Sequence, residues 1–387
     1  MSDDQQELLA PIRQTVEQVC SKFPGEYWRE KDSQRQYPGE FVQALTDAGL
    51  LACLIPEEYG GSGLTLTVAS EILKTIHESG CNAAACHAQM YTMGTLLRHG
   101  SEQQKTQYLP RIAQGKLRLQ AFGVTEPTAG TDTTSISTTA VRDGDKYIVN
   151  GQKVWISRAE HSDLMVLLAR TTPRDRVAKR SDGLSVFIVD MNEAVDRGMT
   201  IKPVATMINH ATTEIFFDNL AIPADSLIGE EGKGFRYILS GMNAERILIA
   251  SECIGDARWF VKTASEYATD RKVFGRPIGQ NQGVQFPIAR AYAQSAAADL
   301  MVRDAALAYD AGQPCGSEAN MAKMLASEAS WAAGEACMQC HGGFGLAQEY
   351  DIERKWRETR LYQIAPISTN LILAYLGEHV LGMPRSY

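Results

Sequence analysis

The sequence predicts a mainly helical α+β protein built from three consecutive segments: helical over residues 1–120, rich in β-strands over 121–230, and helical again over 231–387. Two observations support this. Apolar residues recur at helical spacing in the outer segments, whereas the middle segment has short runs of β-branched and aromatic residues between turn sequences. At 387 residues, the chain is long enough for two or three domains with a large core.

The first segment contains several amphipathic helical stretches. The turn P-E-E-Y-G-G-S-G-L at 56–64 interrupts them with three glycines. Residues 102–110 predict a short helix that ends at Pro110, because proline cannot continue the helical hydrogen bonds. The apolar positions at helical spacing include Leu8, Leu9, Ile12, Val16 and Val19, and then Phe41, Leu45, Leu50 and Leu51.

The middle segment predicts a small antiparallel barrel or sandwich. Its turn sequences include 143–145 and 150–151, and the charged stretch 171–182 predicts an exposed loop. The β-rich runs lie at 147–149, 154–156, 164–168, 184–189 and 215–217.

The last segment predicts long helices up to about residue 272, over 284–311, over 318–338 and from 368 to the end. The glycine-rich stretch 229–235 that precedes them lacks the P-loop spacing, and the sequence has no G-x-G-x-x-G. Neither of these nucleotide-binding loops is therefore predicted.

Composition excludes several classes of protein. A net charge of −8 argues against nucleic acid as a partner, and no apolar run reaches the length that spans a membrane. The acidic start M-S-D-D-Q-Q-E is neither a secretory signal nor a basic transit peptide, so we expect a cytoplasmic location. The eight cysteines are scattered, as reduced, buried cysteines are.

A cluster of hydroxyl groups surrounds the turn at 122–131, which contains Gly123, Pro127 and Gly130. Glycine permits close approach of a ligand, and free N–H groups beside hydroxyls suit a phosphate or a polar ring edge. Trp155 and Ser157 are two residues apart, so on a strand they would share one face and could meet a planar ligand. The same pattern also fits a polar turn followed by a core tryptophan.

Two further stretches contain candidate functional groups. Glu245 lies on a largely apolar predicted helix, where a carboxylate facing a cavity would have the raised pKa of a general base; the alternative is a solvated helix position. The cluster 271–275 with Gln282 offers basic, aromatic and amide groups for a pyrophosphate, or is an ordinary helix C-terminus where cations are favoured.

Other motifs do not support an activity. Cys337–His341 spells the C-x-x-C-H pattern of haem attachment, but no export signal accompanies it, and a zinc site there would lack a fourth ligand. We therefore predict no metal. Ser157 and Ser185 lack the context of a hydrolase nucleophile, and the histidines are isolated in the sequence.

Taken together, the motifs resemble the acyl-CoA dehydrogenase family over nearly the whole chain. The resemblance implies an N-terminal helical domain (1–120), a central β-barrel or sandwich domain (121–230) and a C-terminal four-helix bundle (231–387). It also implies one FAD per subunit and a homotetramer, or sometimes a dimer. The matching motifs, in order, are P-E-E-Y-G-G-S-G-L at 56, V-T-E-P-T-A-G-T-D at 124, W-I-S at 155, G-E-E-G-K-G-F at 229, R-K-V-F-G at 271 and H-G-G-F-G at 341.

The resemblance assigns binding roles to these motifs. Thr131, Asn243 and Arg246 would contact the substrate. The residues around the flavin would be Phe122, Val124, Thr125, Gly130, Thr131, Trp155, Ile156 and Ser157. The residues reaching the FAD of a neighbouring subunit would be Arg271, Phe274 and Gln282, those holding the adenosine and pyrophosphate would be Gln339, Gly342 and Gly343, and further FAD contacts would come from Ser368 and Asn370.

The catalytic base departs from the commonest pattern of the family. Many members carry it in a Y-E-G-T motif, but here Pro366 stands where that glutamate would be, and proline cannot abstract a proton. The isovaleryl and long-chain branches place the glutamate on an earlier helix, and 243–246 matches that context. The resemblance therefore implies that Glu245 removes the α-proton while a hydride passes to flavin N5, with the thioester carbonyl bound to the Glu245 backbone amide.

Several readings stay open. An electron-transfer flavoprotein is the expected electron acceptor of a dehydrogenase, but an acyl-CoA oxidase, an enoyl-CoA reductase or a flavin-dependent lyase would share the fold. Decarboxylation of the glutaryl type is disfavoured because Asn82 stands where that branch keeps an arginine. A non-catalytic acyl-CoA-binding protein is the alternative from another class. The acyl chain itself is not specified by the motifs.

Overall fold

The computed structural model describes residues 3–386, and contacts between residues divide the chain into two compact units. Unit 1 comprises residues 1–34, 65–83 and 243–387, and unit 2 comprises residues 35–64 and 84–242. Each unit is therefore assembled from segments that are distant in the sequence. Among residues 3–386, no helix is both long enough and apolar enough to cross a bilayer.

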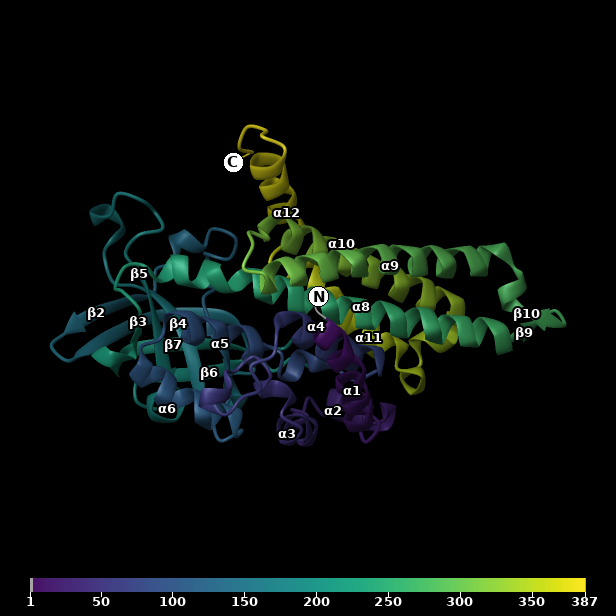
Figure 1. The fold of residues 1–387 in the computed structure, drawn as a ribbon, viewed down its shortest axis with the longest axis horizontal. Coiled ribbons are helices and arrows are strands. Elements are labelled where there is room, and N and C mark those ends of the chain that lie inside the picture. Colours follow the sequence, from purple (N-terminus) through teal and green to yellow (C-terminus); the bar gives the residue numbers. More distant parts are fainter. Residues whose placement is uncertain (1–2, 387) are drawn as a thin grey trace. The chain divides into compact units, whose positions relative to one another are not determined.

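Unit 2 is built around an eight-stranded sheet with the order β6-β7-β3-β2-β4-β5-β8, in which β1 also pairs with β4 (Figure 1). The strands are β1 (Leu119–Gly123), β2 (Thr139–Asp143), β3 (Lys146–Ser157), β4 (Leu164–Arg170), β5 (Leu184–Asp190), β6 (Met199–Pro203), β7 (Thr212–Pro223) and β8 (Leu227–Ile228). The helices of this unit are α3 (Gly39–Asp47), α5 (Ala88–His99), α6 (Glu102–Ala113) and the short α7 (Met191–Ala194).

The two faces of this sheet contribute to two separate cores. Every residue of β4 is buried. Leu164, Val166 and Leu168 pack in one core with residues of α5 and α6, whereas Met165 and Leu167 pack in the other core with residues of β3, β5 and β7. A strand that is covered on both faces reads as a continuous apolar run, which explains L-M-V-L-L in the sequence.

The predicted strands lie where the sequence placed them, but one predicted turn and the purely antiparallel pairing were wrong. Gly144 forms the predicted turn between β2 and β3, with φ +64°. Residues 150–151 are not a turn, because β3 continues through them with a bulge. Gly151 has φ +146°, and a Cβ there would lie 2.5 Å from Oγ1 of Thr138, so only glycine fits. The sheet is also not purely antiparallel, because β4 pairs in parallel with β1 and β2.

Unit 1 is helical. Small residues such as Ala257, Ala291 and Ala333 alternate with Phe260 in a core shared by α8, α9, α10 and α11, which lets these helices approach closely. In Figure 1 the long helices α8, α9 and α10 lie side by side. The elements are α1 (Asp3–Cys20), α2 (Gly25–Ser33), α4 (Leu66–Glu78), α8 (Gly234–Asp270, which begins in unit 2), the hairpin β9 (Lys272–Val273) and β10 (Arg276–Pro277), α9 (Gln282–Asp310), α10 (Gly316–His341), α11 (Ile352–Arg360) and α12 (Thr369–Tyr375).

Three helix predictions were wrong. The last helix does not reach the end of the chain, because α12 ends at Tyr375, a π-helical turn covers Leu376–Val380 and residues 381–386 are not helical. Helix α6 continues past Pro110 to Ala113, so this proline removes one N–H from the helical hydrogen bonds without ending the helix. Helix α11 was not predicted, because its sequence I-E-R-K-W-R-E-T-R is mostly charged. Its Arg354 and Lys355 are nevertheless buried.

Lys355 belongs to a buried network of charged groups in unit 1. Oδ1 of Asp256 accepts hydrogen bonds from Nζ of Lys355 at 2.7 Å and from Nδ1 of His77 at 3.0 Å. The backbone N–H of Ala83 donates to Nε2 of His77 at 3.0 Å, which fixes the tautomer with the proton on Nδ1. Burial alone would raise the pKa of Asp256, but Lys355 and His77 outweigh it and lower the pKa. The network joins α4, α8 and α11.

Replacing Lys355 by methionine should destabilise the protein by about 3–5 kcal/mol, because Asp256 would keep a buried charge without its main partner. Urea unfolding followed by circular dichroism measures this. Lys262, exposed on α8, is the matched control, and Lys262→Met should change stability by less than about 0.5 kcal/mol. Equal effects of the two substitutions would contradict the importance of the network.

Candidate functional site

The predicted ligand-binding turn after β1 is held by its own backbone. The N–H of Val124 donates to the carbonyl of Phe122 at 3.1 Å. Glu126 and Ala129 exchange two backbone hydrogen bonds, of 3.3 and 3.1 Å, across the turn. Gly130 and Thr131 follow on the surface. The turn therefore presents backbone and hydroxyl groups in a fixed conformation.

A buried ion pair attaches this turn to β3. Nζ of Lys153 lies 2.9 Å from Oε1 of Glu126 and donates to the carbonyl of Val124 at 3.0 Å. The Glu126 carboxylate also accepts from the backbone N–H groups of Ser137 and Thr138, at 2.6 and 2.9 Å. Burial opposes ionisation, but Lys153 and these donors outweigh it and lower the pKa of Glu126 to about 2. Burial lowers the pKa of Lys153 to about 8, so the pair is charged near neutral pH.

The end of β3 turns Trp155 outward. A register shift between Lys153 and Ile156 marks a second bulge, and Trp155 within it has φ +60° and is 60% exposed. Ile156 is buried, and Ser157 is half-buried. Positive φ is costly for an aromatic residue, and residues strained in this way are enriched at functional sites. The structure thus exposes the Trp155 ring, so this residue is not the core tryptophan of the alternative interpretation.

The turn and β3 are in direct contact, since the N–H of Val154 donates to the carbonyl of Thr125 at 3.0 Å. Within unit 2, the structure therefore brings together the predicted flavin residues on either side of this bond. They are Phe122, Val124, Thr125, Gly130 and Thr131 on the turn, and Trp155, Ile156 and Ser157 on the strand.

In unit 1, Glu245 lies inside α8 and is 6% exposed. Its carboxylate has no hydrogen-bond partner among residues 3–386. Burial raises its pKa to about 7, although the charges of Arg246 and Lys323 act in the opposite direction. A buried carboxylate with this pKa can exist in both protonation states near neutral pH, which a general base requires.

Polar groups around Glu245 are incompletely paired. Nη1 of Arg246 donates to Oδ1 of Asn243 at 2.8 Å, while Nε of Arg246 is buried without a partner. Lys323, on α10, is fully buried and donates from Nζ to the carbonyl of Ile367 at 2.6 Å. Burial lowers the pKa of Lys323 to about 8. Lys323 thereby fixes the segment that precedes α12.

One expectation about Glu245 was wrong. The family resemblance implied that its backbone amide binds the thioester carbonyl. Glu245 lies in the interior of α8, more than one turn from Gly234 where the helix begins. A backbone N–H in that position bonds to the carbonyl four residues earlier in the helix. The amide is therefore already used, and the role of Glu245 is confined to its carboxylate.

The third group of predicted residues surrounds the end of α10. The guanidinium of Arg271 lies 5.7 Å from the centre of the Phe344 ring, so it meets the turn that holds Gly342 and Gly343. Gly342 has φ +58°, and a Cβ on either glycine would meet no atom within 4 Å. Gln339 is exposed on the last turn of α10. Arg271 and the turn with Gly342 and Gly343 thus lie together in one chain, and there is free space beside the two glycines.

The remaining predicted residues lie apart from that turn. Phe274, with φ +53°, is fully exposed at the tip of the β9–β10 hairpin, and Gln282 is exposed at the start of α9. Ser368 caps α12, because its Oγ accepts from the N–H of Leu371 at 3.4 Å. Asn370 is exposed in the first turn of α12.

The C-x-x-C-H motif has structural partners. Nδ1 of His341 lies 2.9 Å from the carbonyl of Cys337, and its ring stacks on Tyr267 with centroids 3.9 Å apart. The Cys340 thiol donates to the carbonyl of Ala264. Cys337 and His341 thus contact each other one helical turn apart, whereas Cys340 faces α8.

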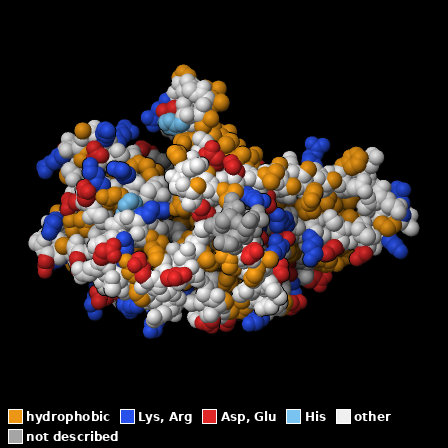
Figure 2. Space-filling model, in the orientation of Figure 1, with side chains coloured by type: hydrophobic (Ala, Val, Ile, Leu, Met, Phe, Trp, Pro, Cys, Tyr) orange, Lys and Arg blue, Asp and Glu red, His pale blue; other side chains and the backbone are white. Residues whose placement is uncertain are grey.

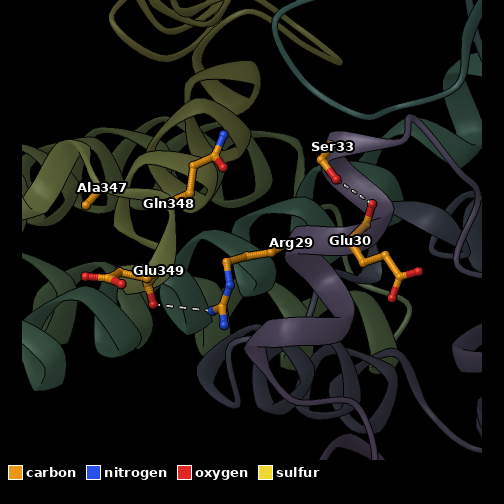
Figure 3. A pocket seen from close by; sticks show the side chains of 6 residues that line it. All are labelled: Arg29, Glu30, Ser33, Ala347, Gln348 and Glu349. Atoms are coloured by element: carbon orange, nitrogen blue, oxygen red, sulfur yellow. Dashed lines mark hydrogen bonds between the residues drawn. The ribbon is translucent and has the colours of Figure 1, made fainter.

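A separate surface pocket of about 550 Å³ lies between α2 and residues 347–349 (Figure 3). Arg29 reaches across it and donates to the carbonyl of Glu349 at 3.4 Å. Ser33 bonds within α2, to the carbonyl of Glu30. None of the predicted site residues lines this pocket, so we assign it no role in the reaction.

Lys153 and Glu126, which hold the turn against β3, were not predicted from the sequence. Lys153 follows Tyr147 and Val149 at even spacing, and all three are buried on β3. A lysine on the core-facing side of a strand needs a buried partner. The burial of Lys153 could therefore have been predicted from the sequence. Its partner Glu126 could not, because it lies 27 residues earlier in the chain.

The chain is similar to known proteins over nearly its whole length. Sequence models of three domains match the chain: the acyl-CoA dehydrogenase N-terminal domain over residues 2–116, the middle domain over 121–220 and the C-terminal domain over 232–380. The acyl-CoA dehydrogenase FadE12 of Mycobacterium tuberculosis is 32% identical over 381 residues, covering 97% of this chain and 96% of that protein.

Two further similarities bear on the chemistry. The 3-(aryl)acrylate reductase of Clostridium sporogenes is 34% identical over 340 residues, or 87% of this chain and 88% of that protein. The solved structure of butyryl-CoA dehydrogenase from Megasphaera elsdenii matches with a TM-score of 0.90 and 27% identity, over 98% of this chain and 99% of that chain.

Replacing Lys153 by methionine should loosen the turn, because Glu126 would lose its buried cation. We expect a loss of about 3–5 kcal/mol in stability and faster amide exchange at Ser137 and Thr138. Hydrogen–deuterium exchange with mass spectrometry measures both residues in one peptide. The control is Lys146→Met, at the exposed start of the same strand, and unchanged exchange in Lys153→Met would show that the pair does not hold the turn.

Proposed function

The chain belongs to the acyl-CoA dehydrogenase family, and from this premise we propose that it uses FAD to dehydrogenate an acyl-CoA thioester to the trans-2-enoyl-CoA. The observation that carries the proposal is the carboxylate of Glu245. It is buried, lacks a hydrogen-bond partner among the described residues and has a pKa raised to about 7. These properties suit a base that removes a weakly acidic α-proton.

The residues present fit a flavin. Trp155 offers an exposed ring, and the hydroxyl groups of Ser157 and Thr131 lie on neighbouring segments. We assign the ring system to these residues together with the turn at 122–125. The exposed Arg271 and the open turn at 342–343 supply a cation and free backbone for phosphates. When bound, FAD supplies the acceptor for the hydride that leaves the substrate β-carbon.

The protein's own residues perform the proton chemistry. Glu245 takes the α-proton onto its carboxylate. Its burial keeps the base unsolvated, so ionised and neutral forms are close in free energy at neutral pH. Arg246 carries a buried Nε–H without an acceptor, and we assign that donor, with Asn243, to the substrate. A substrate acceptor there would complete the pairing of the guanidinium.

The direction of the reaction and the electron acceptor are part of the proposal. We propose an electron-transfer flavoprotein as the acceptor of electrons from the dehydrogenase. The resemblance to a 3-(aryl)acrylate reductase keeps the opposite direction, reduction of an enoyl group, as the second candidate. An oxidase, a lyase and a non-catalytic acyl-CoA-binding protein are the remaining alternatives.

We also propose that the protein is a homo-oligomer, a tetramer or a dimer. One face of α9 is buried at helical spacing through Ile288, Ala291 and Ser295. On the rest of that helix, Tyr292 and Leu300 are 63% and 70% exposed. Figure 2 shows hydrophobic side chains at the surface of the C-terminal helices. An apolar surface on a helix that is already packed on its other face is typical of an interface.

The domain boundaries at about 120 and 230 are likewise proposed, and the family segments ending at 116 and 220 support them. The compact units divide the chain differently, because parts of the first segment contribute to both units. The cytoplasmic location stays a prediction.

The experiment that tests the function is an anaerobic titration of the purified protein with saturated acyl-CoAs of short, long and branched chains, following the flavin absorbance. Loss of the oxidised flavin spectrum with one class would support the dehydrogenase and narrow its substrate. A protein that contains flavin but is not reduced by any thioester would favour the reductase or the lyase. Purification without flavin would favour the binding protein.

The Glu245→Gln variant should retain its flavin but reduce it at least about 100-fold more slowly, because the amide cannot accept the α-proton. In the unmodified protein the rate of flavin reduction should rise with pH through about 7, since only the ionised carboxylate is a base. Stopped-flow absorbance measures both. Glu318, on α10, provides the control Glu318→Gln, whose rate should be unchanged. A normal rate in Glu245→Gln would remove this residue from the mechanism.

The double substitution Tyr292→Asp and Leu300→Asp should convert the assembly into smaller species, because charges would replace an apolar contact surface. Light scattering coupled to size-exclusion chromatography gives the mass. Leu8, 43% exposed on α1, provides the control Leu8→Asp, which should leave the mass unchanged. An unmodified protein that runs as a monomer would rule out the proposed assembly.

A further inference from the structure

Arg158 is a buried cation that no carboxylate neutralises. It follows Ser157 directly and is only 3% exposed. Nη1 lies 3.4 Å from Nε2 of His210, and Nη2 lies 3.5 Å from Nε2 of His87. Both distances are long for a hydrogen bond, and Nε of Arg158 is buried without any acceptor. Across residues 3–386, no acidic side chain forms an ion pair with this guanidinium.

The surroundings of Arg158 do not compensate its charge. Burial lowers the pKa of His210 well below its usual value, and the neighbouring Arg158 lowers it further, so His210 is neutral. A guanidinium can only donate, so both imidazole nitrogens that face it must be acceptors. Acceptors at such long distances recover little of the free energy that is lost when a cation leaves water. The burial of Arg158 therefore costs folding free energy that its protein neighbours do not recover.

The backbone adds to that cost. Arg158 has φ +59°, a conformation that costs a residue with a side chain about 1–2 kcal/mol. Its N–H donates to the carbonyl of Ala211 at 2.8 Å, which holds it there. Strained residues of this kind are enriched at active sites and ligand-binding sites.

A neighbouring polar group also lacks a hydrogen-bond partner. Tyr37 donates from its hydroxyl to the carbonyl of Ala85 at 3.1 Å and accepts from Nε2 of Gln120, also at 3.1 Å. The other end of that amide, Oε1 of Gln120, is buried without a donor. Arg158 acts electrostatically on Tyr37, so these groups lie in one neighbourhood. The protein therefore leaves both a cationic donor and an acceptor open.

This neighbourhood adjoins the proposed flavin site within unit 2. Gln120 is two residues before Phe122 on β1, and Arg158 is the residue after Ser157. The ring of Tyr91 links the two places, since it lies 5.6 Å from the ring of His87 and 6.5 Å from that of Phe122. Arg158 therefore lies in the neighbourhood of the proposed flavin site, and because its side chain is only 3% exposed, a ligand for it would have to be a small group.

We propose that Arg158 binds a carboxylate at the far end of the acyl chain, so that the substrate is an acyl-CoA with a terminal acid group. This inference rests on the proposed function. A carboxylate is small, matches the planar donor fork of a guanidinium and supplies the missing negative charge. His87 and His210 then hold the guanidinium at the sides of the fork that the carboxylate does not use.

Binding of unreactive analogues tests the inference without requiring turnover. We would use 3-thia-acyl-CoA pairs of equal chain length, one ending in a methyl group and one in a carboxylate, and titrate the flavin-loaded protein by calorimetry. The unmodified protein should bind the carboxylate analogue at least about 10-fold more tightly. In Arg158→Met its affinity should fall roughly 10- to 100-fold, as for the loss of charged hydrogen bonds, while the methyl analogue should bind as well or better.

Controls separate charge, folding and catalysis. Arg142→Met removes an exposed arginine from β2 and should not change either affinity. Arg158→Lys keeps the charge and should retain part of the preference, and flavin content with melting temperature shows whether each variant is folded. Equal binding of the two analogues by the unmodified protein, or an equal loss of both in Arg158→Met, would overturn the inference. If no acyl-CoA reduces the flavin, the function fails but this binding result still stands on its own.

Discussion

The ion pair of Glu126 and Lys153 is the constraint on which the candidate site in unit 2 depends. Nζ of Lys153 donates to the carbonyl of Val124 as well as to the carboxylate. The Glu126 carboxylate in turn accepts from the backbone N–H groups of Ser137 and Thr138. A pair of apolar side chains of equal size would fill the space but would leave those backbone groups buried and unbonded. The charges are therefore required by the turn, and the turn fixes where Thr125 meets the strand that presents Trp155.

Helix α8 shows how the environment assigns roles to similar groups. Asp256 and Glu245 are both buried carboxylates on this helix. Asp256 is paired with Lys355 and its pKa is lowered, whereas Glu245 has no partner among the described residues and its pKa is raised to about 7. The first is a permanent charge that stabilises packing, and the second can exchange a proton. Two carboxylates whose environments move their pKa values apart are what acid–base chemistry needs.

The sequence predicted what depends on periodicity and on neighbours in the chain. The continuous run of β4, the turn at Gly144 and the place of Glu245 on a largely apolar helix were all available from the local sequence. What it did not predict depends on partners far along the chain. The charged helix α11 is stable because Lys355 finds Asp256 on another helix, and Gly151 belongs to a bulge because Thr138 lies against it. From the sequence alone, Arg158 would be predicted to lie on the surface, whereas the structure buries it.

The last residues of β3 combine two functions in one short stretch. Trp155 and Arg158 both have positive φ, and they flank Ile156, which is buried, and Ser157. The first strained residue turns a ring outward, and the second turns a cation into the interior. If the ring holds the flavin and the cation holds the end of the acyl chain, the same bulged strand sets the position of both relative to Ser157. A carboxylate on Arg158 would then fix the length of acyl chain whose α- and β-carbons lie at the flavin, so charge and chain length would be selected together.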